Sequence, residues 1–331
     1  MKFLVTGATG YIGVPLAKRL AGESHTVHAL YRDETKTAPL KNLDNIHLYK
    51  GDLLDADSLA RAAQGCDAVF HAAAFAKAWD KDEQTFYRLN VQGSLNVLEA
   101  AKKAGAERFV FTSTAGVISP SNGLASNENT HRKLDYFTHY EASKARAEES
   151  LAKQAKGALE SITVNPTRVY GPGLMSDSNG VTKMIKLYLK GKFRILPGNG
   201  QSIGNYAYID DVVDGHIKAM LLGKAGERYI LGGENISFEE FFNLLADLTG
   251  KSAKMYKMPI PLMNLAARAM EIRANLTGAP PLLTPPWVKR YLFNWELSSD
   301  KAVRELGYRI TPIQDGLAKT VDWILKNRSS R

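Results

Sequence analysis

Cysteine is almost absent from this chain of 331 residues, which has a single thiol, Cys66. One cysteine excludes an intramolecular disulfide and a cysteine-rich zinc site, and it is typical of proteins that work in a reducing compartment. Cys66 follows Gly65 in an apolar segment. We therefore expect it to be a small buried hydrophobic residue and not a catalytic thiol.

Long hydrophobic runs are also missing. No run approaches the roughly 18 apolar residues that a membrane span needs. The first residues, Phe3-Leu4-Val5, look like a short strand and turn directly into glycines, unlike the long apolar core of a signal peptide. We expect a cytoplasmic protein with no membrane span.

Acidic residues are fewer than basic ones, 34 against 43, which leaves a net charge of +9. The lysines and arginines are scattered along helical segments and form no stripe with interleaved aromatic residues, as a single-strand nucleic-acid binder requires. We expect a solvated basic surface, a small-molecule substrate, no nucleic acid and no metal.

Short apolar runs alternate with segments of helical period over the first half of the chain. Strands are expected near 2–6, 26–31, 46–49, 68–72, 108–113 and 161–165, and helices over 11–22, 56–64, 84–104 and 138–155. This order predicts an α/β fold with a doubly wound parallel (Rossmann) sheet that binds ligands at the carboxyl ends of its strands. Residues 1–170 are the expected dinucleotide-binding domain. Residues 171–331 are the expected smaller α/β substrate domain, with segments around 205–225 returning to the first.

The first expected strand ends in a glycine-rich turn, Thr6-Gly7-Ala8-Thr9-Gly10-Tyr11-Ile12-Gly13, and a helix follows at once. Gly7 permits a tight turn, Gly10 lets backbone amides approach a pyrophosphate, and Gly13 lets the helix pack closely. The helix N-terminus offers unpaired N–H groups to the phosphates. The turn therefore predicts a dinucleotide site.

This turn resembles the TGATGYIG fingerprint of the extended short-chain dehydrogenases/reductases, the group that includes NAD-dependent epimerases and dehydratases. Gly51-Asp52-Leu53, Phe70-His71-Ala72-Ala73-Ala74 and Asn90-Val91-Gln92-Gly93-Ser94 follow in the family's order. The chain is most similar to dihydroflavonol-reductase-like and 3β-hydroxysteroid-dehydrogenase-like members. For cofactor binding the resemblance implies the following residues: Gly7, Thr9, Gly10, Tyr11, Ile12, Gly13, Asp52, Leu53, Ala72, Ala73, Ala74, Thr112, Tyr140, Lys144 and Pro166.

The end of the second strand decides which nicotinamide cofactor binds, because an acidic residue there suits the ribose 2′-OH and an arginine suits a 2′-phosphate. This chain has Tyr31-Arg32-Asp33. Arg32 resembles the arginine of NADP-using reductases and favours NADP. Asp33 lies beside it and keeps NAD possible as the cofactor.

Tyr140 and Lys144 form a Y-x-x-x-K pair, one helical turn apart on the same face. A nearby cation lowers the pKa of a phenol, which makes Tyr140 a credible proton donor. Tyr188 and Lys192 share this spacing, but Gly191 interrupts their helix and no strand ending in hydroxyls precedes them.

A strand ending in hydroxyls does precede Tyr140, and the family places its catalytic hydroxyl last in such a run, which matches Thr114. Thr112 and Ser113 are then expected to cap backbone groups. By the same resemblance, Pro166 belongs to the loop that covers the nicotinamide, and Asp211 is a structural brace.

Reductases, epimerases and dehydratases share this trio, and two absences favour a reductase. Dehydratases of the family follow the catalytic hydroxyl with Asp-Glu, where this chain has Ala115-Gly116, and nucleotide-sugar epimerases place a phosphate-binding arginine where it has Gly204. We expect hydride transfer between NADP(H) and a carbonyl or secondary alcohol of an apolar small molecule. A nucleotide-sugar epimerase with bound NAD is the alternative. An intact trio speaks against a third reading, a regulator without catalysis.

Two features are left with more than one interpretation. Residues 259–272 and Pro285-Pro286-Trp287 form an apolar lid, or a helix that packs on the core or on a second subunit. Relatives often form homodimers through helices that match 84–104 and 138–155.

Overall fold

The first strand, β1 (Lys2–Thr6), sends alternate side chains into two hydrophobic cores in the computed structural model, which describes residues 1–157, 159–175, 179–250 and 254–327. Phe3 and Val5 join the core on one face of the sheet, and Leu4 joins the core on the other. All three are buried. Burial on both faces explains why the strand is an unbroken apolar run.

Within the described residues, seven parallel strands form the central sheet, in the order β10-β6-β5-β4-β1-β2-β3. The direction of winding changes between β1 and β4, the kind of switch point at which such sheets bind ligands. The prediction of a doubly wound parallel sheet is confirmed. The remaining strands of the sheet are β2 (Thr26–Tyr31), β3 (Ile46–Lys50), β4 (Ala68–His71), β5 (Arg108–Thr112), β6 (Glu160–Pro166) and β10 (Arg228–Leu231).

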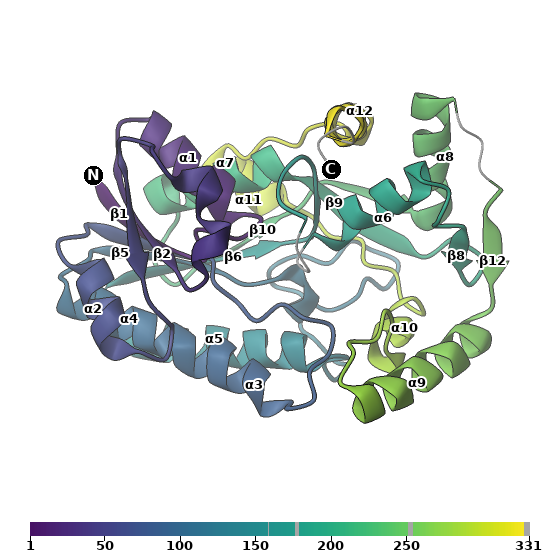
Figure 1. Cartoon of the computed structure of the whole chain (residues 1–331), viewed down its shortest axis with the longest axis horizontal. Coiled ribbons are helices and arrows are strands. Elements are labelled where there is room, and N and C mark those ends of the chain that lie inside the picture. Colours follow the sequence, from purple (N-terminus) through teal and green to yellow (C-terminus); the bar gives the residue numbers. More distant parts are fainter. Residues whose placement is uncertain (158, 176–178, 251–253, 328–331) are drawn as a thin grey trace.

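Helices cover both faces of this sheet (Figure 1). One face carries α2 (Ala56–Ala63), α4 (Gly93–Lys103) and α5 (His139–Ala155), and the other carries α1 (Gly13–Gly22), α7 (Ile209–Leu222) and α11 (Asp300–Leu306). The six strands expected from the sequence are present to within one residue at each end, but β10 was missed, because a four-residue apolar run has no clear period.

The segment expected to be one helix over 84–104 is instead three pieces. A π-helical turn at Arg88–Gln92 joins α3 (Gln84–Tyr87) to α4. Single π turns inside helices often occur at functional sites. Here the turn carries Asn90, which is buried.

The rest of the chain packs beside the carboxyl edge of the sheet. The strands β7 (Arg168–Tyr170), β9 (Ile203–Tyr208) and β11 (Glu234–Ser237) form one small sheet, and β8 (Ile195–Pro197) pairs with β12 (Tyr256–Met258). α7 packs on β5 and β6, so the chain returns to the main sheet before β10. The division into two domains at residue 170 stays a prediction. The helices of this part are α6 (Gly180–Leu189), α8 (Phe238–Thr249), α9 (Ile260–Thr277), α10 (Pro285–Arg290) and α12 (Ile313–Lys326).

No helix in the described part of the chain combines the length and the apolar content needed to cross a bilayer. The same residues contain no group of three or more His, Cys, Asp or Glu side chains arranged to hold a metal ion.

Candidate active site

The glycine turn between β1 and α1 is too tight for side chains at two of its three glycines. Gly7 has φ +69°, and a Cβ there would lie 2.6 Å from the Ala73 nitrogen. A Cβ on Gly13 would collide with the Gly7 carbonyl, so Gly13 packs against the turn itself more than against the sheet. Gly10 donates its N–H to that same carbonyl (2.8 Å). This bond closes the turn between the strand and the helix, the kind of glycine turn against which a pyrophosphate binds.

At the start of α1, the N–H groups of Val14 and Leu16 donate to the carbonyls of Gly10 and Ile12 (both 3.1 Å), and Pro15 has no N–H. The N–H groups that remain for a ligand are those of Tyr11, Ile12 and Gly13, and N–H groups at a helix N-terminus attract anions. Thr9 lies in the turn that faces this end. Tyr11 instead buries its ring and donates its hydroxyl to the Gly171 carbonyl (3.0 Å), so only its backbone remains for a cofactor.

The loop after β4, Ala72-Ala73-Ala74, lies directly against the glycine turn. The N–H of Ala72 donates to the Thr6 carbonyl (3.2 Å), and that of Ala73 donates to the Thr6 hydroxyl (3.4 Å). His71 beneath them is fully buried, and burial, with a smaller effect from the Lys144 charge, lowers its pKa to about 3. His71 is therefore neutral, and its two ring nitrogens bond the hydroxyls of Thr6 and Ser94 (2.5 and 2.8 Å).

At the carboxyl ends of β2 and β3, Arg32 lies 3.9 Å from the Asp52 carboxylate, and its side chain is 73% exposed. Asp33 accepts hydrogen bonds from the N–H and the hydroxyl of Thr35 (3.0 and 2.6 Å), and these bonds lower its pKa. Its carboxylate is thus engaged in a turn.

Leu53 packs on Gly93, where a Cβ would lie 2.9 Å from the leucine Cβ.

Tyr140 lies in the first turn of α5, and its hydroxyl lies near Thr114, which follows β5 and whose own hydroxyl accepts from the Gly116 N–H (3.1 Å). Burial raises the pKa of Tyr140 to about 12, while the nearby Thr114 hydroxyl and the charge of Arg290 act in the opposite direction. The sequence pointed to Lys144 as the cation acting on this phenol. In the structure that cation is Arg290, because the Lys144 ammonium is turned toward the sheet.

The Lys144 ammonium is fully buried and has no hydrogen-bond partner. It lies 3.9 Å from the centre of the Phe111 ring. Burial lowers its pKa to about 7, although the charge of Glu148 acts to raise it. A buried ammonium without acceptors is unfavourable, so the position fits a ligand that offers hydroxyl groups, such as the ribose of a dinucleotide.

Thr112, Ser113 and Pro166 lie at the ends of β5 and β6, and their contacts show which of their groups remain for a cofactor. The Thr112 hydroxyl bonds Nε2 of His216 (3.0 Å), whose Nδ1 bonds the Val212 carbonyl (2.7 Å), so Thr112 has only its backbone left for a cofactor. The Ser113 hydroxyl is buried without a partner. Pro166 is the last residue of β6 and lies beside Leu231 in β10.

The π turn braces the catalytic helix. The Asn90 amide accepts from the Phe75 N–H (2.7 Å) and donates to the Ser143 hydroxyl (2.9 Å), which donates to the Tyr140 carbonyl (2.9 Å). The sequence indicated this bracing motif but not the π turn that positions it.

An ionic cluster beside Tyr140 was missed from the sequence. Glu141, buried in α5, forms an ion pair with Arg290 of α10 and lies 3.9 Å from Arg132. Rings of Trp287 and Trp295 lie 5.0 and 4.1 Å from the Arg290 guanidinium. The only sequence signal was the place of Arg290 three residues after Trp287.

The lack of an arginine at position 204 is weaker evidence against a nucleotide-sugar substrate in the structure than in the sequence. A Cβ on Gly204 would collide with the guanidinium of Arg168, which reaches across from β7. A cation from another segment, Arg168, therefore lies beside this position, and the argument against a phosphate-bearing substrate that rested on Gly204 is weaker.

Other expected features lie apart from this cluster. Tyr188 packs on Phe242 (5.2 Å between ring centres), and Lys192 follows the end of α6, so the second Y-x-x-x-K pair is separate from the site. Asp211 accepts from the N–H and hydroxyl of Thr311 (both 2.7 Å), as a brace does. Cys66 is buried, as expected.

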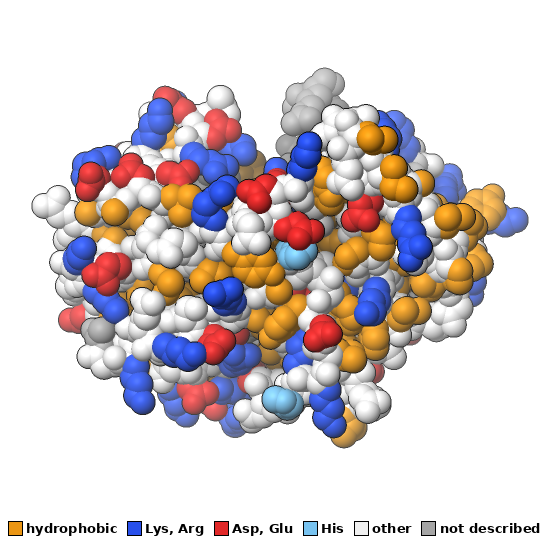
Figure 2. Space-filling model, turned by 90° about the horizontal axis from the view of Figure 1, so that it is seen from below, with side chains coloured by type: hydrophobic (Ala, Val, Ile, Leu, Met, Phe, Trp, Pro, Cys, Tyr) orange, Lys and Arg blue, Asp and Glu red, His pale blue; other side chains and the backbone are white. Residues whose placement is uncertain are grey.

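Helix α9, which covers most of the segment expected as a lid or a packing helix, packs on α10 through Met263, Ala267 and Val288. Its other face exposes Leu265 and Leu276. Figure 2 shows hydrophobic side chains gathered over the part of the surface where α9 lies.

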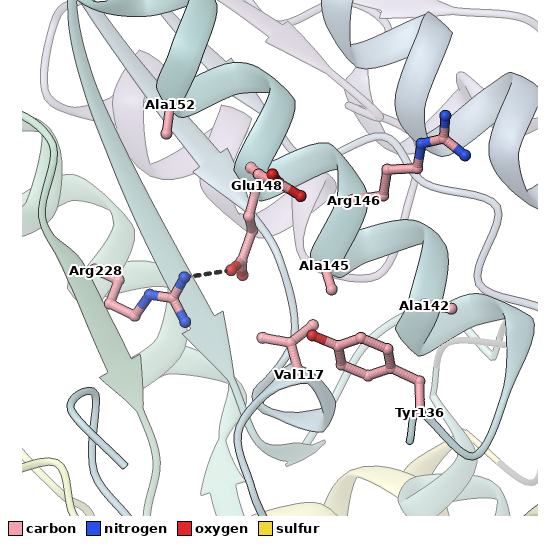
Figure 3. Close-up of a pocket in the computed structure, with 9 residues that line it drawn as sticks. Val117, Tyr136, Ala142, Ala145, Arg146, Glu148, Ala152 and Arg228 are labelled. Carbon is pink, nitrogen blue, oxygen red and sulfur yellow. Dashed lines mark hydrogen bonds and ion pairs between the residues drawn. The ribbon is translucent and has the colours of Figure 1, made fainter. Parts of the chain in front are cut away.

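A hollow of about 560 Å³ lies on the side of α5 opposite Tyr140 and Lys144. Figure 3 shows Ala142, Ala145 and Ala152 facing it and Glu148 paired with Arg228 (2.7 Å). It is separate from the catalytic groups.

The fold and this geometry define a dinucleotide-binding oxidoreductase. The family model for the NAD dependent epimerase/dehydratase family matches residues 3–232, and the chain belongs to that family. It is an enzyme of the extended short-chain dehydrogenase/reductase type, in a family described as NAD-dependent.

Individual relatives differ in activity. The chain is 33% identical to a putative dihydroflavonol 4-reductase from Synechocystis, over 97% of this chain and 94% of that one. It is 29% identical to a 2-alkyl-3-oxoalkanoate reductase from Stenotrophomonas maltophilia, over 96% and 98%. A dTDP-glucose 4,6-dehydratase from Streptomyces venezuelae, solved with NAD bound, superimposes with a TM-score of 0.79 at 26% identity, covering 100% and 98%.

Proposed function

We propose that this enzyme transfers hydride reversibly between NADP(H) and a carbonyl or secondary alcohol of an apolar small molecule. One observation carries the proposal: the Tyr140 hydroxyl lies near Thr114 at the carboxyl edge of the sheet, next to a buried Lys144 with no partner. A proton donor, a second hydroxyl and a ribose-binding cation are the groups that carbonyl reduction needs.

Each residue has a separate task in the reduction. The hydroxyls of Thr114 and Tyr140 hold the substrate oxygen, and Tyr140 gives up its proton as negative charge develops there. A Tyr140 pKa of about 12 keeps the phenol protonated at neutral pH, as a donor requires. Lys144 holds the ribose hydroxyls. NADPH, when bound, supplies the hydride.

Two observations support NADP over NAD. Arg32 is exposed and contacts a carboxylate only at 3.9 Å, so its planar guanidinium is available to a 2′-phosphate. Asp33, the residue that would accept from a ribose 2′-OH, is already occupied by Thr35.

Aromatic side chains support an apolar substrate. Phe137 lies 5.2 Å from Phe293 and 6.1 Å from Trp295, between ring centres, and Trp295 also lies against Arg290. These rings pack between α10 and the start of α5, close to Glu141, the neighbour of Tyr140. One relative's name specifies a 2-alkyl-3-oxoalkanoate, a ketone that carries alkyl chains and a carboxylate.

A nucleotide-sugar epimerase with bound NAD is the second candidate. The Arg168 guanidinium over Gly204 favours it, because a cation there is available to a diphosphate. The reductase is preferred because an epimerase keeps one NAD and has no need of Arg32.

We further propose a homodimer that pairs through α4 and α5. The outward face of α5 carries Ala142, Ala145 and Ala152, which permit close approach of another helix. Light scattering at micromolar protein tests this, and a monomer would contradict it. The cytoplasmic location stays a prediction.

One experiment separates the two enzyme functions. Purified protein is given NADPH and a panel of ketones, aldehydes, hydroxysteroids and UDP- and dTDP-sugars. A reductase consumes NADPH stoichiometrically with one carbonyl, seen as loss of reduced-nicotinamide absorbance. Protein that arrives with tightly held NAD, ignores every carbonyl and interconverts a sugar nucleotide would refute the reductase.

A further inference from the structure

We propose that Glu148 is a positioning residue of the active site, which holds Thr114 in place through the side chain of Asn165. Glu148 lies in α5, one turn after Lys144, and is not among the residues assigned above to the cofactor or the substrate. The inference rests on the role that the proposed function gives to Thr114, which is to hold the substrate oxygen.

The backbone pairing between β5 and β6 ends just before Thr114. Thr112 and Val164 are the last paired residues, and beyond them the Ser113 N–H donates to the Val164 carbonyl (2.8 Å). Pro166, two residues further along β6, has no N–H that it could donate to β5. The end of β5 that carries Thr114 therefore depends on a side chain for its attachment to β6.

The Asn165 side chain supplies this attachment. Its amide nitrogen donates one hydrogen to the Thr114 carbonyl (3.1 Å) and the other to the Glu148 carboxylate (2.8 Å). Asn165 and Glu148 are both buried, and hydrogen bonds are stronger in such surroundings than in water. The Thr114 hydroxyl also accepts from the Gly116 N–H (3.1 Å), so Thr114 is held at its carbonyl and at its side chain.

Glu148 determines which way the Asn165 amide points. The amide oxygen of Asn165 is buried and has no hydrogen-bond partner among the described residues, so no bond at the oxygen fixes the orientation. With the amide turned by half a rotation, its oxygen would face both the Glu148 carboxylate and the Thr114 carbonyl, and like partial charges repel. Because an ionised carboxylate only accepts hydrogen bonds, it keeps the amide nitrogen toward Thr114.

Arg228 of β10 holds the Glu148 carboxylate from the other side. Its guanidinium donates to Oε2 (2.7 Å), while Asn165 donates to Oε1. Figure 3 shows the pair of Arg228 and Glu148 at the wall of the hollow beside α5. The hollow is separate from the catalytic groups, but three hydrogen bonds lead from this wall through Glu148 and Asn165 to Thr114.

Glu148 also acts on Lys144 through its charge, which raises the pKa of the ammonium. An effect through Lys144 has a different signature, because Lys144 is proposed to hold the cofactor ribose. It would change NADPH binding, whereas the bond through Asn165 acts on the step in which Thr114 holds the substrate oxygen. The two effects are therefore separable in kinetics.

The test is a double-mutant cycle of Glu148→Ala and Thr114→Val, measured with NADPH and whichever carbonyl the wild type reduces. We expect Glu148→Ala to lower kcat about three- to tenfold at nearly unchanged NADPH affinity. In Thr114→Val, which has lost the hydroxyl, the same replacement should cause no further loss of kcat. Glu149→Ala is the matched control and should keep the wild-type kcat, because Glu149 lines the same hollow but is 67% exposed and pairs with Lys153.

A second set of variants separates the bond to Asn165 from the ion pair with Arg228. Glu148→Gln offers one acceptor oxygen to two donors, and the charged guanidinium of Arg228 competes for it, so kcat should fall. Adding Arg228→Met leaves that oxygen to Asn165 and should bring kcat back to within about threefold of the wild type. If the ion pair served only stability, this double variant would be no better than Glu148→Gln. Thermal unfolding of each variant shows that it is folded.

Three outcomes would overturn the positioning role while the reductase function remains. They are a wild-type kcat in Glu148→Ala, a loss from Glu148→Ala that persists in full in Thr114→Val, and a loss that is confined to NADPH affinity. If no carbonyl is reduced and a sugar nucleotide is epimerised, the reductase proposal is wrong. The same cycle is then measured on epimerisation, which uses the same trio, and independent losses there would refute the role of Glu148.

Discussion

Replacing Lys144 by methionine should stabilise the free enzyme while it weakens cofactor binding. The buried ammonium has no hydrogen-bond partner, and burial depresses its pKa from 10.5 to about 7. At about 1.4 kcal/mol per pKa unit, this depression corresponds to a penalty of about 5 kcal/mol for the charged form. Methionine has a similar length and no charge, so we expect Lys144→Met to gain on the order of 2–5 kcal/mol at pH 6.

The stability that Lys144→Met gains over the wild type should decrease as the pH rises. Below pH 7 the lysine is charged in both states and the full penalty is present. Between about pH 7 and 10.5 the unfolded chain binds more protons than the folded one, so the wild type becomes more stable as pH rises. The difference between wild type and variant should shrink across this window.

Thermal unfolding of both proteins from pH 6 to 10, with and without NADPH, measures this effect. The cofactor should stabilise the wild type more than Lys144→Met, because the variant lacks the ammonium proposed to hold the ribose. Lys153→Met, an exposed position in the same helix, is the control and should change little. A variant less stable than the wild type at pH 6 without cofactor would show that Lys144 is satisfied within the protein.

Three further predictions follow from the site. Arg32→Ala should weaken NADPH binding by about 1.5–3 kcal/mol and change NADH binding little, measured by fluorescence titration; equal losses would indicate a structural role. Gly13→Ala should abolish dinucleotide binding because its Cβ meets the Gly7 carbonyl, whereas Gly22→Ala, with open space around it, should bind normally; normal binding by Gly13→Ala would disprove the tight turn. Thr114→Val should lower kcat about tenfold or more at unchanged NADPH affinity, and Thr114→Ser should restore it; unchanged kcat would remove Thr114 from the site.

The sequence was sufficient for six strands of the sheet and for the glycine turn and catalytic helix at its carboxyl edge. Val5, Gly7 and Gly13 lie close together along the chain, so the sequence alone predicts the strand, the tight turn and the helix to which they belong. Tyr140 and Lys144 are likewise related by one helical turn, a spacing that the helix geometry alone determines.

Contacts between distant segments could not be predicted in the same way. Arg168 and Gly204 are brought together by the pairing of β7 with β9, and Arg290 meets Glu141 across nearly half the chain. Nothing in the spacing of these residues encodes their contact. The π turn at Asn90 was hidden for a similar reason, because it depends on the hydrogen bonds of Asn90 with Phe75 and Ser143.

The most direct test of the central claim measures NADPH binding and NADPH oxidation in Tyr140→Phe with whichever carbonyl the wild type reduces. Phenylalanine keeps the ring and removes the hydroxyl with its proton. We predict unchanged NADPH affinity and a loss of turnover by a factor of about a hundred or more. Turnover near the wild-type rate would contradict the assignment of Tyr140 as the proton donor.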